Sequence, residues 1–112
     1  MIYHSVQLDI LEATALICPL ASLWHHHDIN QFATVVLLTL RNEEIEKVII
    51  DLMCIRHIDQ RAARALRIIG RLSERQGKPV ILTHVDERVR NELHIHGLDQ
   101  SFGITLTPEE VL

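Results

Sequence analysis

The stretch that decides the fold is 48-VIIDLMCIRHIDQRAARALRIIGRLSERQGKPVIL-82. It begins and ends with short apolar runs, Val48–Ile50 and Val80–Leu82, which are typical of parallel strands buried on both faces. Between them, residues 59–76 carry apolar residues at helical spacing, and Gly77 and Pro79 predict where that helix ends. A strand, a helix and a second strand in this order predict a parallel β–α–β unit.

The residues before this unit predict two strands and a helix. Apolar and polar residues alternate over residues 5–11, and residues 14–18 suit a second strand. Residues 28–41 have apolar positions at helical spacing, and Asp28 is expected to be the N-cap, with Gln31 completing a capping box.

The residues after the unit predict a third helix and a last strand. Asp86 is expected to cap a helix that ends at Gly97, and Phe102, Ile104 and Leu106 alternate as in a strand. The whole pattern predicts an α/β fold with a mixed sheet, and 112 residues without a linker or repeat predict one domain over residues 1–112.

Composition limits the classes of function. Hydrophobic residues make up 47% of the chain, which is rich for its size and indicates apolar surface that faces a partner. The net charge of −4 argues against a DNA-binding protein. The N-terminus lacks the pattern of a signal peptide, and the apolar run near residues 35–40 is too short to insert into a bilayer, so we expect a cytoplasmic protein.

Cysteine and histidine residues do not form a recognisable metal motif. Cys18 and Cys54 lack CxxC spacing and are expected to be reduced, buried thiols. The run His25–His27 is expected to be a solvated turn, and the pair His94 and His96 lacks a distant partner pair. We therefore expect no metal site and no cofactor.

Enzyme motifs are also missing from the sequence. It has no GxGxxG, P-loop or GxSxG motif. Asp51 and Asp59 could form a carboxylate pair for acid–base chemistry. The pattern instead makes Asp51 a residue at a strand end and Asp59 a helix cap, so we expect no catalysis.

The helix over residues 59–76 has one cationic face. Five arginines lie three or four residues apart and share a side of the helix, whereas the opposite side is apolar. Ile68 lies among the arginines. Guanidinium groups bind carboxylates and phosphates bidentately, so this face suits an anionic partner surface; an ordinary solvated face is the alternative. The arginines are Arg61, Arg64, Arg67, Arg71 and Arg75.

The order of these motifs resembles the STAS domain, the family of sulfate-transporter C-terminal domains and anti-sigma factor antagonists. The matching pieces are V-I-I-D-L, D-Q-R-A-A-R-A-L, the turn Q-G-K, P-V-I-L-T-H-V, V-R-N-E-L and H-G-L, between residues 48 and 98. The resemblance implies a mixed sheet of four or five strands with helices packed mainly on one side.

The resemblance also implies a function in signalling and transcription regulation. Family antagonists bind a partner protein, often a kinase-like anti-sigma factor, and a Ser or Thr after the family's Asp in this turn accepts phosphate. Asp59 matches that Asp, but the acceptor positions match Gln60 and Arg61, which have no hydroxyl group, and the usual Gly is Ala62. We therefore predict partner binding that phosphorylation at this turn does not switch.

The predicted partner-binding residues follow from the turn and the exposed helix face, although Asp59 could also serve only as a cap. Two alternatives stay open: a STAS subunit or domain that regulates a membrane transporter, and a homodimer formed through exposed apolar residues. The predicted binding residues are Asp59, Gln60, Arg61, Arg64, Arg67, Ile68 and Arg71.

Overall fold

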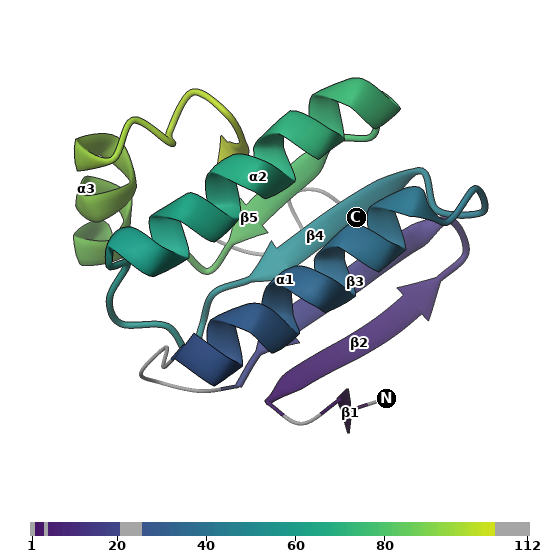
Figure 1. Cartoon of the computed structure of the whole chain (residues 1–112), viewed down its shortest axis with the longest axis horizontal. Helices are drawn as coiled ribbons and strands as arrows, with labels where there is room; N and C mark the ends of the chain where they lie inside the picture. Colours follow the sequence, from purple (N-terminus) through teal and green to yellow (C-terminus); the bar gives the residue numbers. More distant parts are fainter. Residues whose placement is uncertain (1, 4, 21–25, 105–112) are drawn as a thin grey trace.

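The computed structural model describes residues 2–3, 5–20 and 26–104. Strands and helices alternate after an N-terminal hairpin (Figure 1). The elements are β1 (Ile2–Tyr3), β2 (Val6–Leu11), β3 (Thr14–Pro19), α1 (His26–Arg41), β4 (Lys47–Asp51), α2 (Gln60–Gln76), β5 (Val80–Thr83), α3 (Glu87–Ile95) and β6 (Gly103–Ile104).

The sheet is mixed, and its strands lie in sequence order from β1 to β6. β1, β2 and β3 are antiparallel neighbours, whereas β3, β4, β5 and β6 run parallel. The four strands in the middle have four to six residues each, and the two edge strands have two each. The predicted fold class is therefore confirmed, and β1 is a short edge strand that the sequence did not predict.

Helices α1 and α2 lie side by side on one face of the sheet, and α3 lies beside α2 (Figure 1). Successive residues of a strand point to opposite faces, so Val48 and Ile50 of β4 point to one face and Ile49 to the other. All three are fully buried. Ile49 lies between Leu16 of β3 and Ile81 of β5 in the strand register. The prediction that this strand is buried on both faces is confirmed.

Both predicted ends of α2 and the predicted start of α3 agree with the structure, whereas α3 ends at Ile95, two residues before Gly97. The Asp59 side chain accepts a hydrogen bond from the Ala62 backbone N–H, and Asp86 accepts one from Val89 in the same way. Both carboxylates satisfy donors that the first turn of a helix leaves unpaired. Gly77 ends α2 with a φ of 64°, in the left-handed region that glycine adopts without steric strain.

Two predictions about the start of α1 were wrong, and one strand was not predicted. Asp28 is not an N-cap, because α1 already includes His26; its carboxylate lies in the first helical turn, where the helix dipole also favours negative charge. His26 and His27 are therefore helical rather than part of a turn, and His25 lies outside the described residues. β1 was not predicted, since two residues show no periodicity.

The last predicted strand is only partly described. β6 covers Gly103–Ile104, and Leu106 lies outside the described residues. In the part of the chain that the structure covers, no helix combines the length and the apolar character that a bilayer crossing needs.

Candidate functional site

The turn between β4 and α2 is held by contacts to other elements. Leu52 N–H donates to the Thr83 carbonyl at the end of β5, at 3.0 Å, and Ile55 and Ile58 are buried. Ile58 N–H donates to Glu92 Oε2 of α3, at 3.2 Å. Because its backbone and its apolar side chains are both fixed, this turn sets the position at which α2 begins.

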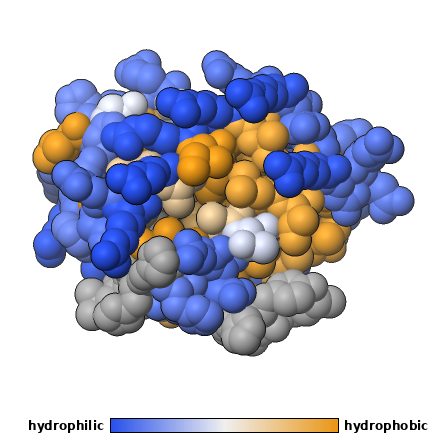
Figure 2. All heavy atoms as spheres, viewed as in Figure 1, coloured by the Kyte–Doolittle hydropathy of each residue, from blue (hydrophilic) through white to orange (hydrophobic). Residues whose placement is uncertain are grey.

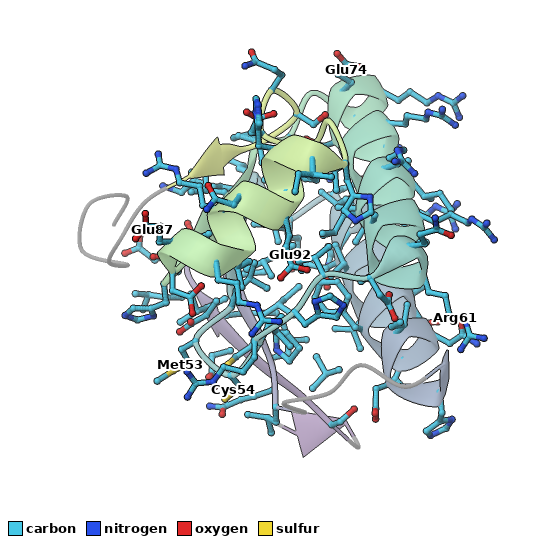
Figure 3. All side chains as sticks on the ribbon, turned by 90° about the vertical axis from the view of Figure 1, so that its left-hand side faces the viewer. Met53, Cys54, Arg61, Glu74, Glu87 and Glu92 are labelled. Atoms are coloured by element: carbon cyan, nitrogen blue, oxygen red, sulfur yellow. The ribbon has the colours of Figure 1, made fainter. Side chains whose placement is uncertain are left out.

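Glu92 connects α3 to this turn through more than one contact. Its Oε2 lies 2.5 Å from His57 Nδ1, and its Oε1 lies 3.6 Å from Arg88 Nε. Figure 3 shows the Glu92 side chain pointing from α3 toward the space beside α2. Sequence patterns do not indicate this role, since Glu92 and Ile58 are 34 residues apart.

Asp59 and the two residues after it form the start of α2. Asp59 Oδ1 accepts the Ala62 N–H at 2.9 Å, so the carboxylate acts as a helix cap. Gln60 and Arg61 are exposed. Figure 3 shows Arg61 pointing away from α3 into solvent. The two positions that the resemblance implied as acceptor positions are thus accessible at a helix N-terminus.

The remaining predicted binding residues lie on the exposed side of α2. Arg64, Arg67 and Arg71 are exposed, and Ile68 keeps 48% of its surface in solvent. The opposite side packs into the core through Ala62, Ala63, Ala65, Leu66 and Ile69. The helix therefore separates a cationic outer side from an apolar inner side.

The arginines of this face do not all point the same way. Arg67 Nη2 donates to the His96 carbonyl at 3.2 Å, so its guanidinium group bends toward the end of α3. Arg61 and Arg64 instead border the boundary with α1. Arg71 lies between these two sides of the helix and lines hollows on both.

A groove runs along the boundary between α1 and α2. It has two adjoining parts, of about 240 and about 220 Å³, which share Leu37 and Ile68. Figure 2 shows apolar atoms on this side of the molecule, with hydrophilic side chains beside them. The first part is lined by Ile29, Asn30, Ala33, Leu37, Arg61, Arg64, Ala65 and Ile68, and the second by Leu37, Arg41, Ile68, Arg71, Leu72 and Arg75.

The groove includes residues of α1 that the sequence did not predict as site residues. The helical pattern of α1 predicted its buried stripe, but only the packing of α1 against α2 brings Ala33 and Leu37 next to Ile68. Leu38 of α1 is 62% exposed, whereas Val35 packs against the core.

A second polar cluster lies where β4 and β5 end. Asp51 is buried, and its Oδ1 lies 2.9 Å from His84 Nδ1 and accepts the Met53 N–H at 3.0 Å. Asp51 is therefore held by local hydrogen bonds at the end of its strand. Its Oδ1 stabilises the turn at Leu52 and Met53. These hydrogen bonds of Asp51 join it to Met53 and His84, and not to Asp59.

Cys18 and Cys54 are free thiols, as predicted. Each is half-buried, whereas the prediction was that they are buried. Burial, the negative charge of Asp51 and the neighbouring Cys54 together raise the pKa of the Cys18 thiol to about 12. Cys18 therefore stays protonated at neutral pH, which makes it a poor nucleophile and metal ligand.

Three of the described histidines, His57, His84 and His94, lie against carboxylates. His94 Nδ1 lies 2.7 Å from Asp99 Oδ2, and this hydrogen bond lowers the pKa of Asp99. Among the residues that the structure describes, no three His, Cys, Asp or Glu side chains are arranged to hold a metal ion.

Residues 6–111 match the family model of the STAS domain. The chain belongs to the STAS domain family. The matched range includes the Asp59 turn and the whole of α2.

Solved structures share the STAS fold with this chain. A variant of RsbS from Moorella thermoacetica superposes with a TM-score of 0.80 at 22% identity, over 93% of this chain and 88% of that one. An anti-sigma-factor antagonist (STAS) domain protein from Planctomyces limnophilus gives a TM-score of 0.79 at 18% identity, over 94% and 92% of the two chains. At these identities the likeness establishes the fold.

A transporter also contains this fold. The murine anion transporter Slc26a9 matches with a TM-score of 0.76 at 16% identity, over 91% of this chain but only 17% of the transporter chain. The STAS fold thus occurs both in antagonist proteins of this chain's size and as a small part of a transporter. None of the curated proteins is similar enough in sequence to be matched with the chain.

Proposed function

We propose that this STAS chain is a cytoplasmic, non-catalytic module that regulates transcription by binding a kinase-like anti-sigma factor or a related regulator. The binding surface is the Asp59 turn with the exposed side of α2. One observation carries the proposal: Ile68 is 48% exposed in the middle of a row of exposed arginines. Interfaces combine such apolar centres with arginine, which binds carboxylates bidentately.

The proposal predicts which substitutions weaken binding. The test uses purified kinase-like anti-sigma factors from the same organism and isothermal titration calorimetry. Arg64→Glu and Ile68→Asp are expected to weaken binding by about ten-fold or more, since both lie near the centre of the proposed surface. Arg67 is not used, because its guanidinium group bonds to the His96 carbonyl and its loss would also disturb the contact with α3.

Arg90→Glu is the matched control, because Arg90 is an exposed arginine on α3 outside the proposed surface. It is expected to change the affinity by less than about two-fold. Equal weakening by Arg64→Glu and Arg90→Glu would show that overall charge, rather than this surface, determines binding.

The same proposal includes the loss of the phosphorylation switch at this turn. Gln60 and Arg61 have no hydroxyl group, and Ser73 is the one Ser or Thr between Thr39 and Thr83. Incubation with the bound kinase and ATP should leave the mass of the chain unchanged. The Gln60→Ser variant restores an acceptor and should gain about 80 Da, the mass of one phosphoryl group. A stoichiometric gain of this mass on the unchanged chain would contradict the proposal.

The likeness to part of Slc26a9 favours a second candidate function, a cytoplasmic STAS subunit or domain that regulates a membrane transporter. The two candidates differ in the partner they require. A gene for a sigma factor or a kinase-like protein beside this one supports the first, and a permease gene supports the second.

A further inference from the structure

The groove between α1 and α2 has the length of a short helix. The residues of α2 that border it extend from Arg61 to Arg75. At a rise of 1.5 Å per residue, these positions span about 21 Å, which corresponds to about four helical turns of a bound segment. Small side chains at the floor leave the groove open. They are Ala33 of α1 and Ala65 of α2.

The floor of the groove is apolar. Leu37 and Ile68 connect its two parts, and Ile68 is the one large apolar side chain of α2 that is exposed. Burying such side chains against a partner is favourable by about 25 cal/mol per Å² of apolar area. A helix with one apolar stripe can cover this floor and keep its polar side in solvent.

The walls of the groove are cationic. Arg61, Arg64, Arg71 and Arg75 project from α2, and Arg41 lies at the end of α1. No acidic residue is among the described residues that line either part. The chain as a whole has a net charge of −4, so this groove has the opposite sign to the average of the molecule. Carboxylates beside the apolar stripe of a bound helix would meet guanidinium groups on these walls.

We propose that the groove between α1 and α2 binds an acidic amphipathic α-helix of the partner protein, an inference that rests on the proposed protein-binding function. It extends the binding surface from α2 alone to α1, through Ala33 and Leu37.

Two other occupants fit the groove less well. A symmetric contact with a second copy would place the arginines of the two grooves opposite each other, and like charges at an interface are costly. A nucleic acid would match the charge, but none of the described residues lining the groove is aromatic, and single strands bind by stacking on aromatic side chains.

The test uses a defined probe rather than an unknown partner. The probe is a fluorescein-labelled helical peptide of about 16 residues, with leucines at three- and four-residue spacing on one side and glutamates on the other. A matched peptide carries lysines in place of the glutamates. In fluorescence anisotropy titrations, the acidic peptide is expected to bind saturably and about ten-fold or more tightly than the lysine peptide.

Variants on both helices locate the binding site. Ala33→Glu on α1 and Ile68→Asp on α2 are each expected to weaken binding of the acidic peptide by about ten-fold, and Arg90→Glu by less than about two-fold. In ¹⁵N NMR spectra of the unmodified chain, the peptide should shift amide signals of α1 and α2 and leave those of β2 unchanged.

Several outcomes would overturn the inference. These are a lack of saturable binding, equal binding of the lysine peptide, tighter binding to phosphatidylglycerol vesicles or to single-stranded RNA than to the acidic peptide, and amide shifts centred on β2. If Ala33→Glu does not affect binding of the anti-sigma factor but Arg64→Glu does, the proposed function stands and the groove inference fails.

Discussion

Asp59 caps α2, and we propose that its carboxylate also contacts the partner protein. Its Oδ1 accepts the Ala62 N–H, which explains its presence by capping alone. It also lies next to Gln60 and Arg61, which are exposed and which the resemblance implied as acceptor positions. Substitutions that separate the cap from the charge can therefore distinguish these two roles.

Asp59→Ala is expected to lower the free energy of unfolding by about 1 kcal/mol, because it removes the cap of α2. Asp59→Asn should change it little, since asparagine caps as well as aspartate does. Urea denaturation measures both. If Asp59→Asn keeps full stability but weakens partner binding, the carboxylate contacts the partner. If both stability and partner binding are unchanged, Asp59 is only a cap.

Cys18 gives a second prediction at the scale of a residue. A pKa of about 12, compared with an ordinary value of 9.0, leaves far less thiolate at pH 8 than an unperturbed thiol has. Alkylation of Cys18 by iodoacetamide should be slower than in the urea-unfolded chain, by about a hundred-fold or more, as measured by peptide mass spectrometry. Asp51→Asn should speed it up, because the negative charge of Asp51 raises the pKa of Cys18.

The linkage to stability has a definite sign. The folded state favours the neutral thiol, so the contribution of Cys18 to stability is complete below pH 9 and decreases as the pH rises from 9 toward 12. Cys18→Ala should remove this part of the pH dependence. An alkylation rate in the folded chain equal to that in the unfolded chain would contradict the burial of this thiol.

At the scale of elements, sequence patterns predicted the helix ends that are set by capping residues close to them in the chain. Both ends of α2 and the start of α3 follow from Asp59, Gly77 and Asp86, whose side-chain or backbone properties act within one helical turn. The contacts of Glu92 with Ile58 and of Arg67 with His96 join residues 34 and 29 positions apart. No periodicity encodes such pairs, which is why the sequence located the start of α2 but not what holds it.

Glu92→Ala is expected to destabilise the chain by about 1 kcal/mol or more, since it leaves the buried Ile58 N–H without its acceptor. Glu92→Gln keeps an acceptor oxygen and should have a smaller effect. Glu74→Ala, at an exposed position of α2, is the control. Guanidinium denaturation measures all three, and equal stability of Glu92→Ala and Glu74→Ala would rule out a role of Glu92 in fixing the turn.

At the scale of the whole molecule, charge is distributed unevenly. The chain carries 15 acidic and 11 basic residues, yet five arginines lie along α2. The sequence predicted this cationic face because a helical repeat of 3.6 residues puts these arginines on one side. It could not predict the groove, because the groove exists only where α2 packs beside α1.

This distribution predicts how binding responds to salt. Raising the NaCl concentration from about 0.05 M to about 0.5 M shortens the Debye length from more than 10 Å to about 4 Å and should weaken partner binding by about ten-fold. The Arg64→Glu variant should show a smaller salt dependence. Binding that strengthens with salt would mean that the acidic surface of the chain, rather than α2, faces the partner.

Cross-saturation NMR of the complex with the bound anti-sigma factor tests the central claim most directly, because it identifies the residues in contact without any substitution. With the unlabelled partner irradiated, amide signals of Arg61, Arg64, Ile68 and Arg71 in the deuterated chain should lose intensity, and those of β2 should keep it. Intensity losses confined to β2 or to α3, with the signals of α2 unchanged, would contradict the assignment of the binding surface.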